Sequence, residues 1–295
     1  MSADMSEQRR ITGIAQGILS SMTYGWMTVF AKLAYREGLG TIELLSYRFG
    51  LSALFLWIYY LIFARKTILC KPGHLPIVLA MGLLGYAMMS LSYFYALNFI
   101  TASLAALVLS LMPSTTTLLA RLVFGEPLTS LKITALLVTF TGAALVIGFH
   151  TGQFDTKGVL LVLLAVFMSA WFSIIGQSVM KTTPPGTVSL YVITAAGLFF
   201  SFLHSPFSLF DGSHSNEGVL YVLLLILIST IPPILLFLAA IEKIGSARTM
   251  MLGCGEPLMA VISAYIVLGE RLTTIQLLGG GAIIAGFFLV TRIES

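Results

Sequence analysis

Apolar runs of about 16 to 24 residues alternate with short polar interruptions along nearly the whole chain. A helix needs about 20 mainly apolar residues to cross the hydrocarbon core of a bilayer. The interruptions are short except at residues 64–74 and 204–217, which leaves little room for an extramembrane domain. We therefore predict an all-α membrane protein with ten transmembrane helices, near residues 11–33, 43–63, 75–97, 102–124, 130–149, 158–180, 188–203, 218–241, 246–268 and 273–291.

The composition points to lipid as the solvent. Apolar residues make up 58% of the 295 residues and charged residues 9%, whereas a soluble globular chain carries about 25% charged residues. The net charge of +4 comes from Lys and Arg at the ends of the predicted helices, which is typical of contacts with lipid headgroups and not with nucleic acid. The first apolar run is longer than that of a signal peptide, so we expect it to be retained as the first span.

The sequence repeats itself at an offset of 144 residues. Residues 124–129 (FGEPLT), near the end of the fourth predicted helix, match residues 268–273 (LGERLT), near the end of the ninth, and the same offset places Pro113 on Pro257. Such self-similarity indicates a duplicated architecture. We predict two five-helix repeats, residues 11–149 and 158–291, with a connector at 150–157 and tails at 1–10 and 292–295.

An odd number of helices in each repeat predicts that the two repeats cross the membrane in opposite directions. This inverted topology is common in secondary transporters, which use it for alternating access. With the N-terminus in the cytoplasm, 11 Lys and Arg fall on the cytoplasmic side and 4 on the other side, when Arg48 is counted as intramembrane. That bias agrees with the positive-inside rule, so we expect both termini to be cytoplasmic.

These motifs resemble one known family. The paired Gly-Glu-(Pro/Arg)-Leu-Thr turns, the Gly-Glu-Pro at residues 255–257, the Arg48-Phe49 pair and the duplicated ten-helix layout are similar to the EamA-type branch of the drug/metabolite transporter superfamily. The resemblance covers about residues 12–148 and 157–291. It implies a multi-pass exporter of small metabolites, often amino acids, in the bacterial inner membrane. It does not fix the substrate, because the superfamily also contains nucleotide-sugar and sugar-phosphate carriers and drug exporters.

Glu256 is the strongest single candidate for a residue that takes part in transport. It lies about ten residues from either end of the ninth predicted helix, which at about 1.5 Å per residue places it near the middle of the bilayer. A carboxylate there costs about 2.5 to 3.5 kcal/mol and marks a functional site unless it is paired. We interpret it as a proton-coupling or substrate-binding acid. The alternative is a residue that ties the ninth helix to a neighbour.

Arg48 lies a few residues inside the second predicted helix. Its guanidinium presents a fork of donors that suits a substrate carboxylate. The alternative readings are that it reaches the membrane interface or pairs with Glu43.

Aromatic and hydroxyl side chains supply further candidates for substrate binding. Tyr86, Ser90 and Tyr93 share one face of the third predicted helix, together with Met89. Trp26 and Trp171 occupy nearly equivalent positions of the two repeats and are candidate gates. The alternative for the face of the third helix is ordinary packing, and the alternative for each Trp is a position at the membrane interface.

Prolines and glycines mark where helices can bend or approach each other. Pro113, Pro257, Pro232 and Pro233 interrupt the fourth, ninth and eighth predicted helices and are hinge candidates. Residues 279–281 and Gly286 are glycines that allow the tenth helix to pack closely against a partner. The partner could be a helix of a second copy of the chain, so a homodimer is an open alternative.

The sequence gives no reason to expect an enzyme, a cofactor or a metal site. The four His lie at helix ends or in loops, no Walker-type loop is present, and Cys70 and Cys254 are far apart. The leading interpretation is a secondary transporter that exports a small metabolite, an amino acid before others. The alternatives are an exporter of drugs or lipophilic cations, and, with less support, a membrane enzyme or a non-transporting partner subunit.

Overall fold

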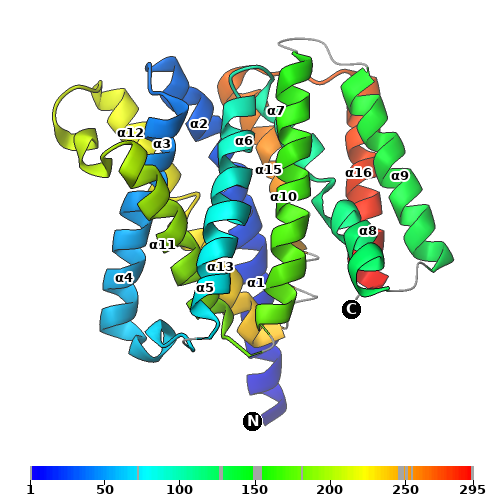
Figure 1. The fold of residues 1–295 in the computed structure, drawn as a ribbon. Coiled ribbons are helices and arrows are strands. Elements are labelled where there is room, and N and C mark those ends of the chain that lie inside the picture. Colours follow the sequence, from blue (N-terminus) through cyan, green and yellow to red (C-terminus); the bar gives the residue numbers. More distant parts are fainter. Residues whose placement is uncertain are drawn as a thin grey trace. The chain divides into compact units, whose positions relative to one another are not determined.

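The structure is a computed structural model of the chain. It describes residues 2–71, 73–125, 129–148, 155–180, 182–244, 249, 252–253 and 255–293. The chain divides into two compact units, and Figure 1 labels their helices. Unit 1 contains residues 1–29, 101–154 and 228–295, and unit 2 contains residues 30–100 and 155–227. Each unit therefore combines segments from both predicted repeats.

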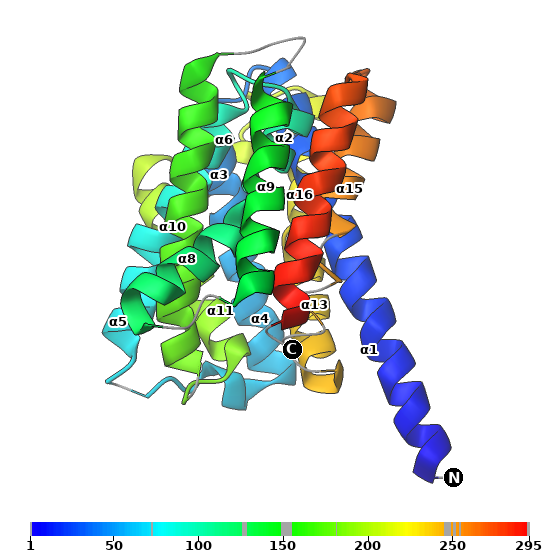
Figure 2. The ribbon, with the colours of Figure 1, turned by 90° about the vertical axis from the view of Figure 1, so that its right-hand side faces the viewer.

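Unit 1 is built from helices that pack in pairs. Its elements are α1 (Ser2–Gly25), α7 (Ala102–Leu109), α8 (Met112–Phe124), α9 (Ser130–Gly148), α13 (Ile231–Ile244), α15 (Gly255–Ser263), the π-helical η5 (Ala264–Leu268) and α16 (Thr274–Ile293). Helix α16 lies alongside α9, as Figure 2 shows, and α1 packs against α13 and α15. These pairs bury the apolar faces that the sequence pattern predicts.

Small residues bring α9 and α16 together. A Cβ atom added to Gly142 would lie 2.6 Å from the Gly279 carbonyl oxygen, and one added to Gly279 would lie 2.7 Å from the Gly142 oxygen. Gly286 likewise leaves no space for a Cβ beside Thr139. The predicted close packing of the tenth helix is therefore present, and its partner is α9 of the same chain.

Unit 2 contains the remaining helices. Its elements are α2 (Met27–Arg36), α3 (Thr41–Ser46), the π-helical η1 (Tyr47–Leu51), α4 (Ser52–Phe63), the 3₁₀-helical η2 (Arg65–Ile68), α5 (Leu75–Ala80), the π-helical η3 (Met81–Ala87), α6 (Met88–Ala96), α10 (Thr156–Met180), α11 (Pro185–Leu203), the 3₁₀-helical η4 (Pro206–Phe210) and α12 (Asn216–Leu227). Helix α10 packs against α6 and η3, and α11 packs against η1, η3 and α3.

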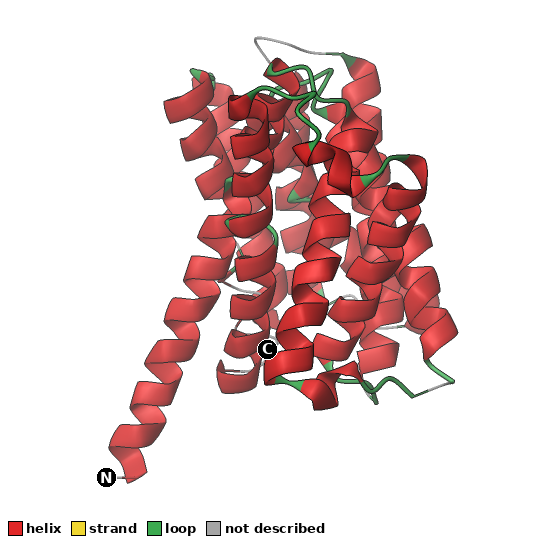
Figure 3. Cartoon of the chain, turned by 90° about the vertical axis from the view of Figure 1, so that its left-hand side faces the viewer, coloured by secondary structure: helices red, strands yellow, loops and turns green. Residues whose placement is uncertain are grey.

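Most of the predicted transmembrane helices are present. Among the described residues, seven helices are long and apolar enough to cross a membrane: Thr41–Phe63, Leu75–Ala96, Ala102–Phe124, Ser130–Gly148, Thr156–Met180, Pro185–Leu203 and Asn216–Ala240. Gly255–Leu268 and Thr274–Gly286 are shorter apolar helices. The predicted first span is divided at Trp26, between α1 and α2. The described residues contain no strand (Figure 3), so this part of the chain is all-helical, while the count of ten stays a prediction.

The hinge candidates lie at places where helices begin. Pro113 is the second residue of α8, Pro232 and Pro233 follow the first residue of α13, and Pro257 is the third residue of α15. Proline lacks the backbone N–H, which has no intrahelical partner in the first turn anyway, so proline is tolerated there. The prolines therefore separate α7 from α8 and α12 from α13, where one continuous helix would otherwise run.

Candidate functional site

The predicted site residues are divided between the two units. Unit 2 contains Arg48, Tyr86, Ser90, Tyr93 and Trp171. Unit 1 contains Trp26 and Glu256, together with Pro113, Pro232, Pro233 and Pro257.

Arg48 is buried inside unit 2. It lies in η1, and its side chain is 2% exposed. The guanidinium carbon lies 4.7 Å from the centre of the Phe49 ring and 4.9 Å from the centre of the Phe94 ring. Rings at these distances stabilise a cation through their negative faces. An arginine that reached the membrane interface would be exposed at its tip, so the structure favours a buried cation at this position.

An aromatic chain extends from this cation toward α10. The Phe49 ring meets the Tyr86 ring edge to face at 5.5 Å and stacks on Phe200 at 5.7 Å. Tyr86 in turn contacts the ring of Phe172 at 5.7 Å. Trp171 precedes Phe172 on α10, and its indole contacts a different ring, that of Phe167. Tyr86 therefore links the Arg48 region to α10.

Helix α6 places a buried hydroxyl group beside this region. Ser90 is 1% exposed, and its Oγ has no hydrogen-bond partner. Ser90 lies one turn before Phe94, so it shares the helix face that meets Arg48. Tyr93 is also buried, at 2% exposure. A buried polar atom without a partner is unfavourable, which marks Ser90 as a position where a ligand or a water molecule can bind.

Trp171 lines an apolar groove of about 420 Å³ on unit 2. Ten residues of α5, η3 and α10 form its walls: Ile77, Ala80, Met81, Leu84, Gly85, Phe167, Met168, Trp171, Phe172 and Ile175. No charged side chain is among them. Of the predicted binding residues, only Trp171 lines this groove, while Arg48, Tyr86, Ser90 and Tyr93 lie outside its lining.

Glu256 lies at a helix start within unit 1. It is the second residue of α15, and its backbone N–H donates a hydrogen bond to the Gly253 carbonyl at 3.0 Å. The N-terminus of a helix favours a negative charge. Gly25 permits a close approach of α1, because a Cβ there would lie 2.8 Å from the Glu256 carbonyl oxygen. Trp26 follows Gly25, at the break between α1 and α2.

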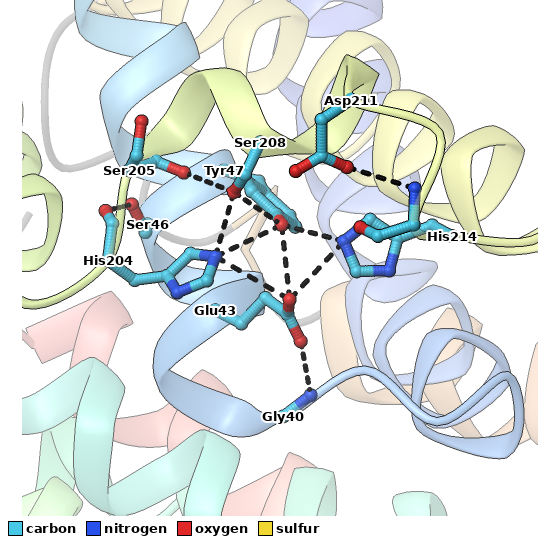
Figure 4. A network of polar contacts seen from close by, with 10 residues as sticks. Gly40, Glu43, Ser46, Tyr47, His204, Ser205, Ser208, Asp211 and His214 are labelled. Carbon is cyan, nitrogen blue, oxygen red and sulfur yellow. Dashed lines mark hydrogen bonds and ion pairs between the residues drawn. The ribbon is translucent and has the colours of Figure 1, made fainter.

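A polar cluster that the sequence pattern did not predict lies in unit 2, where the segment after α11 meets α3 and η1 (Figure 4). The Tyr47 hydroxyl is at its centre, 2.8 Å from His214 Nε2, 3.0 Å from Ser208 Oγ and 3.2 Å from His204 Nε2. Glu43 Oε1 lies 3.1 Å from the same hydroxyl, and 3.3 and 3.5 Å from His214 and His204. Glu43 therefore pairs with two His side chains. The signal in the sequence was topological, because the second helix begins and the seventh ends on the same predicted side.

The structure describes the metal-ligating side chains and the two Cys only in part. Among the described residues, no group of three or more His, Cys, Asp or Glu is placed to hold a metal ion. Cys70 lies in the loop before α5 and is a free thiol, and Cys254 lies outside the described residues. Glu126 of the first turn motif also lies outside them.

The comparison with protein families finds one match. A family described as the EamA-like transporter family matches residues 11–148 and again residues 156–292. The two matches cover most of the chain and confirm both the resemblance and the presence of two repeats of this type.

Similar proteins are also transporters by name. An uncharacterized transporter of Bacillus subtilis is 24% identical, over 98% of this chain and 96% of its own length. A protein of Salmonella typhimurium named as a probable amino-acid metabolite efflux pump is 28% identical, over 66% of this chain and 70% of its own. A crystal structure superposes with a TM-score of 0.68 at 15% identity, over 97% of this chain and 100% of the other, which shows a shared fold.

Proposed function

Because this chain belongs to the EamA-like transporter family, we propose that it exports small metabolites, amino acids before others, across the bacterial inner membrane. Two relatives, from Salmonella typhimurium and Escherichia coli, are named as probable amino-acid metabolite efflux pumps. The predicted inversion of the two repeats supports a secondary transporter that works by alternating access. In this proposal both termini are cytoplasmic, and the prolines at the starts of α8, α13 and α15 are hinges.

The burial of Arg48 carries the proposal. A guanidinium is a planar fork of N–H donors, and its shape fits a carboxylate better than it fits a neutral sugar or a lipophilic cation. Ser90, on the helix face that contacts Arg48 through Phe94, adds a hydroxyl group with no protein partner. We assign the substrate carboxylate to Arg48, with Tyr86, Ser90 and Tyr93 beside it.

Glu256 is proposed as the acid that couples transport to protons or binds the substrate ammonium group. Its place in the first turn of α15, half-buried among apolar helices, supports this assignment. Trp26 and Trp171 are proposed as aromatic walls of the substrate path. Replacing Glu256 with Gln should abolish the pH dependence of transport. Unchanged transport and pH dependence in E256Q would remove Glu256 from coupling.

Counterflow of labelled amino acids in liposomes tests the amino-acid proposal. The purified protein should accumulate at least one amino acid, and Arg48→Gln should abolish that uptake. Arg48→Lys keeps the charge but loses the planar fork, so it should retain only weak uptake. Arg65→Gln, at an exposed position of η2, is the control and should transport normally. Uptake in R48Q equal to that of the wild type would contradict the assignment of Arg48.

Export of lipophilic cations is a second candidate function, and the apolar groove around Trp171 favours it. Aromatic walls without a charged group suit such ligands. Competition between amino acids and a cationic dye in the same liposome assay separates the two functions. Dye transport by both the wild type and R48Q, without amino-acid counterflow by the wild type, would support this second function over the first.

A further inference from the structure

Five side chains of unit 2 connect the segment after α11 to α3 and η1. Glu43 and Tyr47 lie on consecutive turns of α3 and η1, and His204, Ser208 and His214 lie on residues 204–215 (Figure 4). The cluster is partly shielded from solvent, with side-chain exposures of 13% for His214, 22% for Glu43 and 35% for His204. Protons from the solvent can therefore reach the cluster, while its side chains stay in contact with one another.

We propose that Glu43, His204 and His214 form a proton-binding site that fastens residues 204–215 to the start of α3 when it is protonated. Histidine is the side chain whose charge ordinarily changes between about pH 5 and pH 8. This inference concerns a site separate from Arg48 and Glu256 and does not depend on the identity of the substrate.

The proton changes what the imidazole rings can donate. A neutral ring has one N–H, and the nitrogen without hydrogen can only accept. His214 Nε2 faces both the Tyr47 hydroxyl, at 2.8 Å, and the Glu43 carboxylate, at 3.3 Å. A protonated ring donates from both nitrogens, so Nε2 then offers a charge-assisted hydrogen bond to these oxygens. One bound proton also cancels the charge of the Glu43 carboxylate.

The charged groups around the site are three acids and Arg48. Asp211 is the other acid close to His214, and it is fully exposed. Glu37 accepts a hydrogen bond from Ser215, and Glu217 lies in the first turn of α12, which packs against η1. The positive Arg48 is also on η1 but contacts the Phe49 and Phe94 rings. A second proton would place two positive rings on the one Glu43 carboxylate.

The predicted topology places this cluster on the side of the membrane opposite to the termini. A site there would respond to the external pH and hold the segment in place when the exterior is acidic. Buffering the two faces of liposomes separately determines which side acts. A response to the internal pH alone would reverse the predicted orientation but keep the proton site.

Hydrogen exchange of the purified full chain tests the proposal directly. The protection factors of residues 208–213, which divide out the intrinsic effect of pH, should be about tenfold higher at about pH 5.5 than at about pH 8, as expected for gaining a charge-assisted hydrogen bond. His214→Gln and His204→Gln should each reduce this difference, and the double variant should abolish it. His74→Gln, which removes a ring bonded to Thr183 at 2.7 Å in another loop, is the matched control and should leave it intact.

Two results would overturn the proposal. One is equal protection of residues 208–213 at both pH values in the wild-type protein. The other is a pH difference that persists in the double variant. If the variants do not fold, NMR of the wild-type His rings decides, because the ring signals of His204 and His214 must change over the same pH range as the protection factors. A change in protection where neither ring titrates contradicts the site.

Discussion

The carboxylate of Glu270 caps the first turn of α7 at Ala102. Its Oε1 accepts a hydrogen bond from the Ala102 N–H at 2.8 Å, and its Oε2 accepts one from the Ser103 N–H at 2.9 Å. The first N–H groups of a helix have no intrahelical partner, and a negative charge is stabilised there. Gly269, in the left-handed conformation at φ 71°, turns the chain so that Glu270 reaches this helix end. The turn motif of the second repeat therefore has a defined structural role within unit 1.

Replacing Glu270 with Gln should destabilise the protein by about 1 to 2 kcal/mol, because the amide NH₂ would face backbone donors and the charge would be lost. Unfolding in detergent, followed by circular dichroism, measures the change. Glu7→Gln, at an exposed position of α1, is the control and should have no effect. A loss equal to that of the control would mean that the cap contributes no stability.

The contact between Gly142 and Gly279 predicts a second loss of stability. A Cβ at position 142 would lie 2.6 Å from the α16 backbone, and Gly142→Val adds two methyl groups beyond it. We therefore expect overpacking to lower the free energy of unfolding by about 1 to 3 kcal/mol. Gly281→Ala on α16 is the matched control, since nothing lies within 4 Å of its Cβ. It should stabilise the helix by about 0.5 to 1 kcal/mol. Thermal unfolding of both variants shows whether stability is lost only where the glycine lies against a neighbouring helix, or wherever a glycine of these helices is replaced.

The apolar pattern predicted helix positions well wherever a helix is continuous. The predicted helices at 75–97 and 130–149 correspond to Leu75–Ala96 and Ser130–Gly148. It did not reveal the break at Trp26, because hydropathy does not change there, and the breaks near Pro113 and Ile231 were indicated by the prolines alone. The π-helical segments η1, η3 and η5 are also invisible to it, since one extra residue in a turn leaves the apolar content unchanged.

The site was predictable only in part. A charge within an apolar run can be recognised from the sequence, and Arg48 was singled out on that ground. Its ring partner Phe94 comes from another helix, so nothing local to Arg48 indicates that contact. The Glu43 cluster was missed for the same reason, since Tyr47 and His214 are 167 residues apart in the chain. Likewise, the missing partner of Ser90 depends on the packing of several helices.

Ser90→Ala should raise stability and weaken transport together. Removing a buried hydroxyl that has no partner should stabilise the protein by about 1 kcal/mol, whereas a substrate that binds this hydroxyl would lose a hydrogen bond. Ser46→Ala is the matched control, because its buried hydroxyl donates to the His204 carbonyl, and this variant should lose about 1 kcal/mol. Unfolding and counterflow measure the two effects. If S90A lost stability as S46A does, Ser90 would have a protein partner.

The segment of residues 204–215 should also loosen in strong acid. Hydrogen bonds from the Ser213 side chain and backbone N–H lower the pKa of Asp211 from its usual 3.8. An acid with a lowered pKa adds stability above that usual value and loses it as the pH falls through the lowered one, so the protection of the Ser213 amide should decline below about pH 4. Asp211→Asn keeps an oxygen that accepts this N–H but does not titrate, so the decline in protection of the Ser213 amide should be smaller in this variant. Hydrogen exchange between about pH 5 and pH 3 measures both, and an equal decline in D211N would show that another group is responsible.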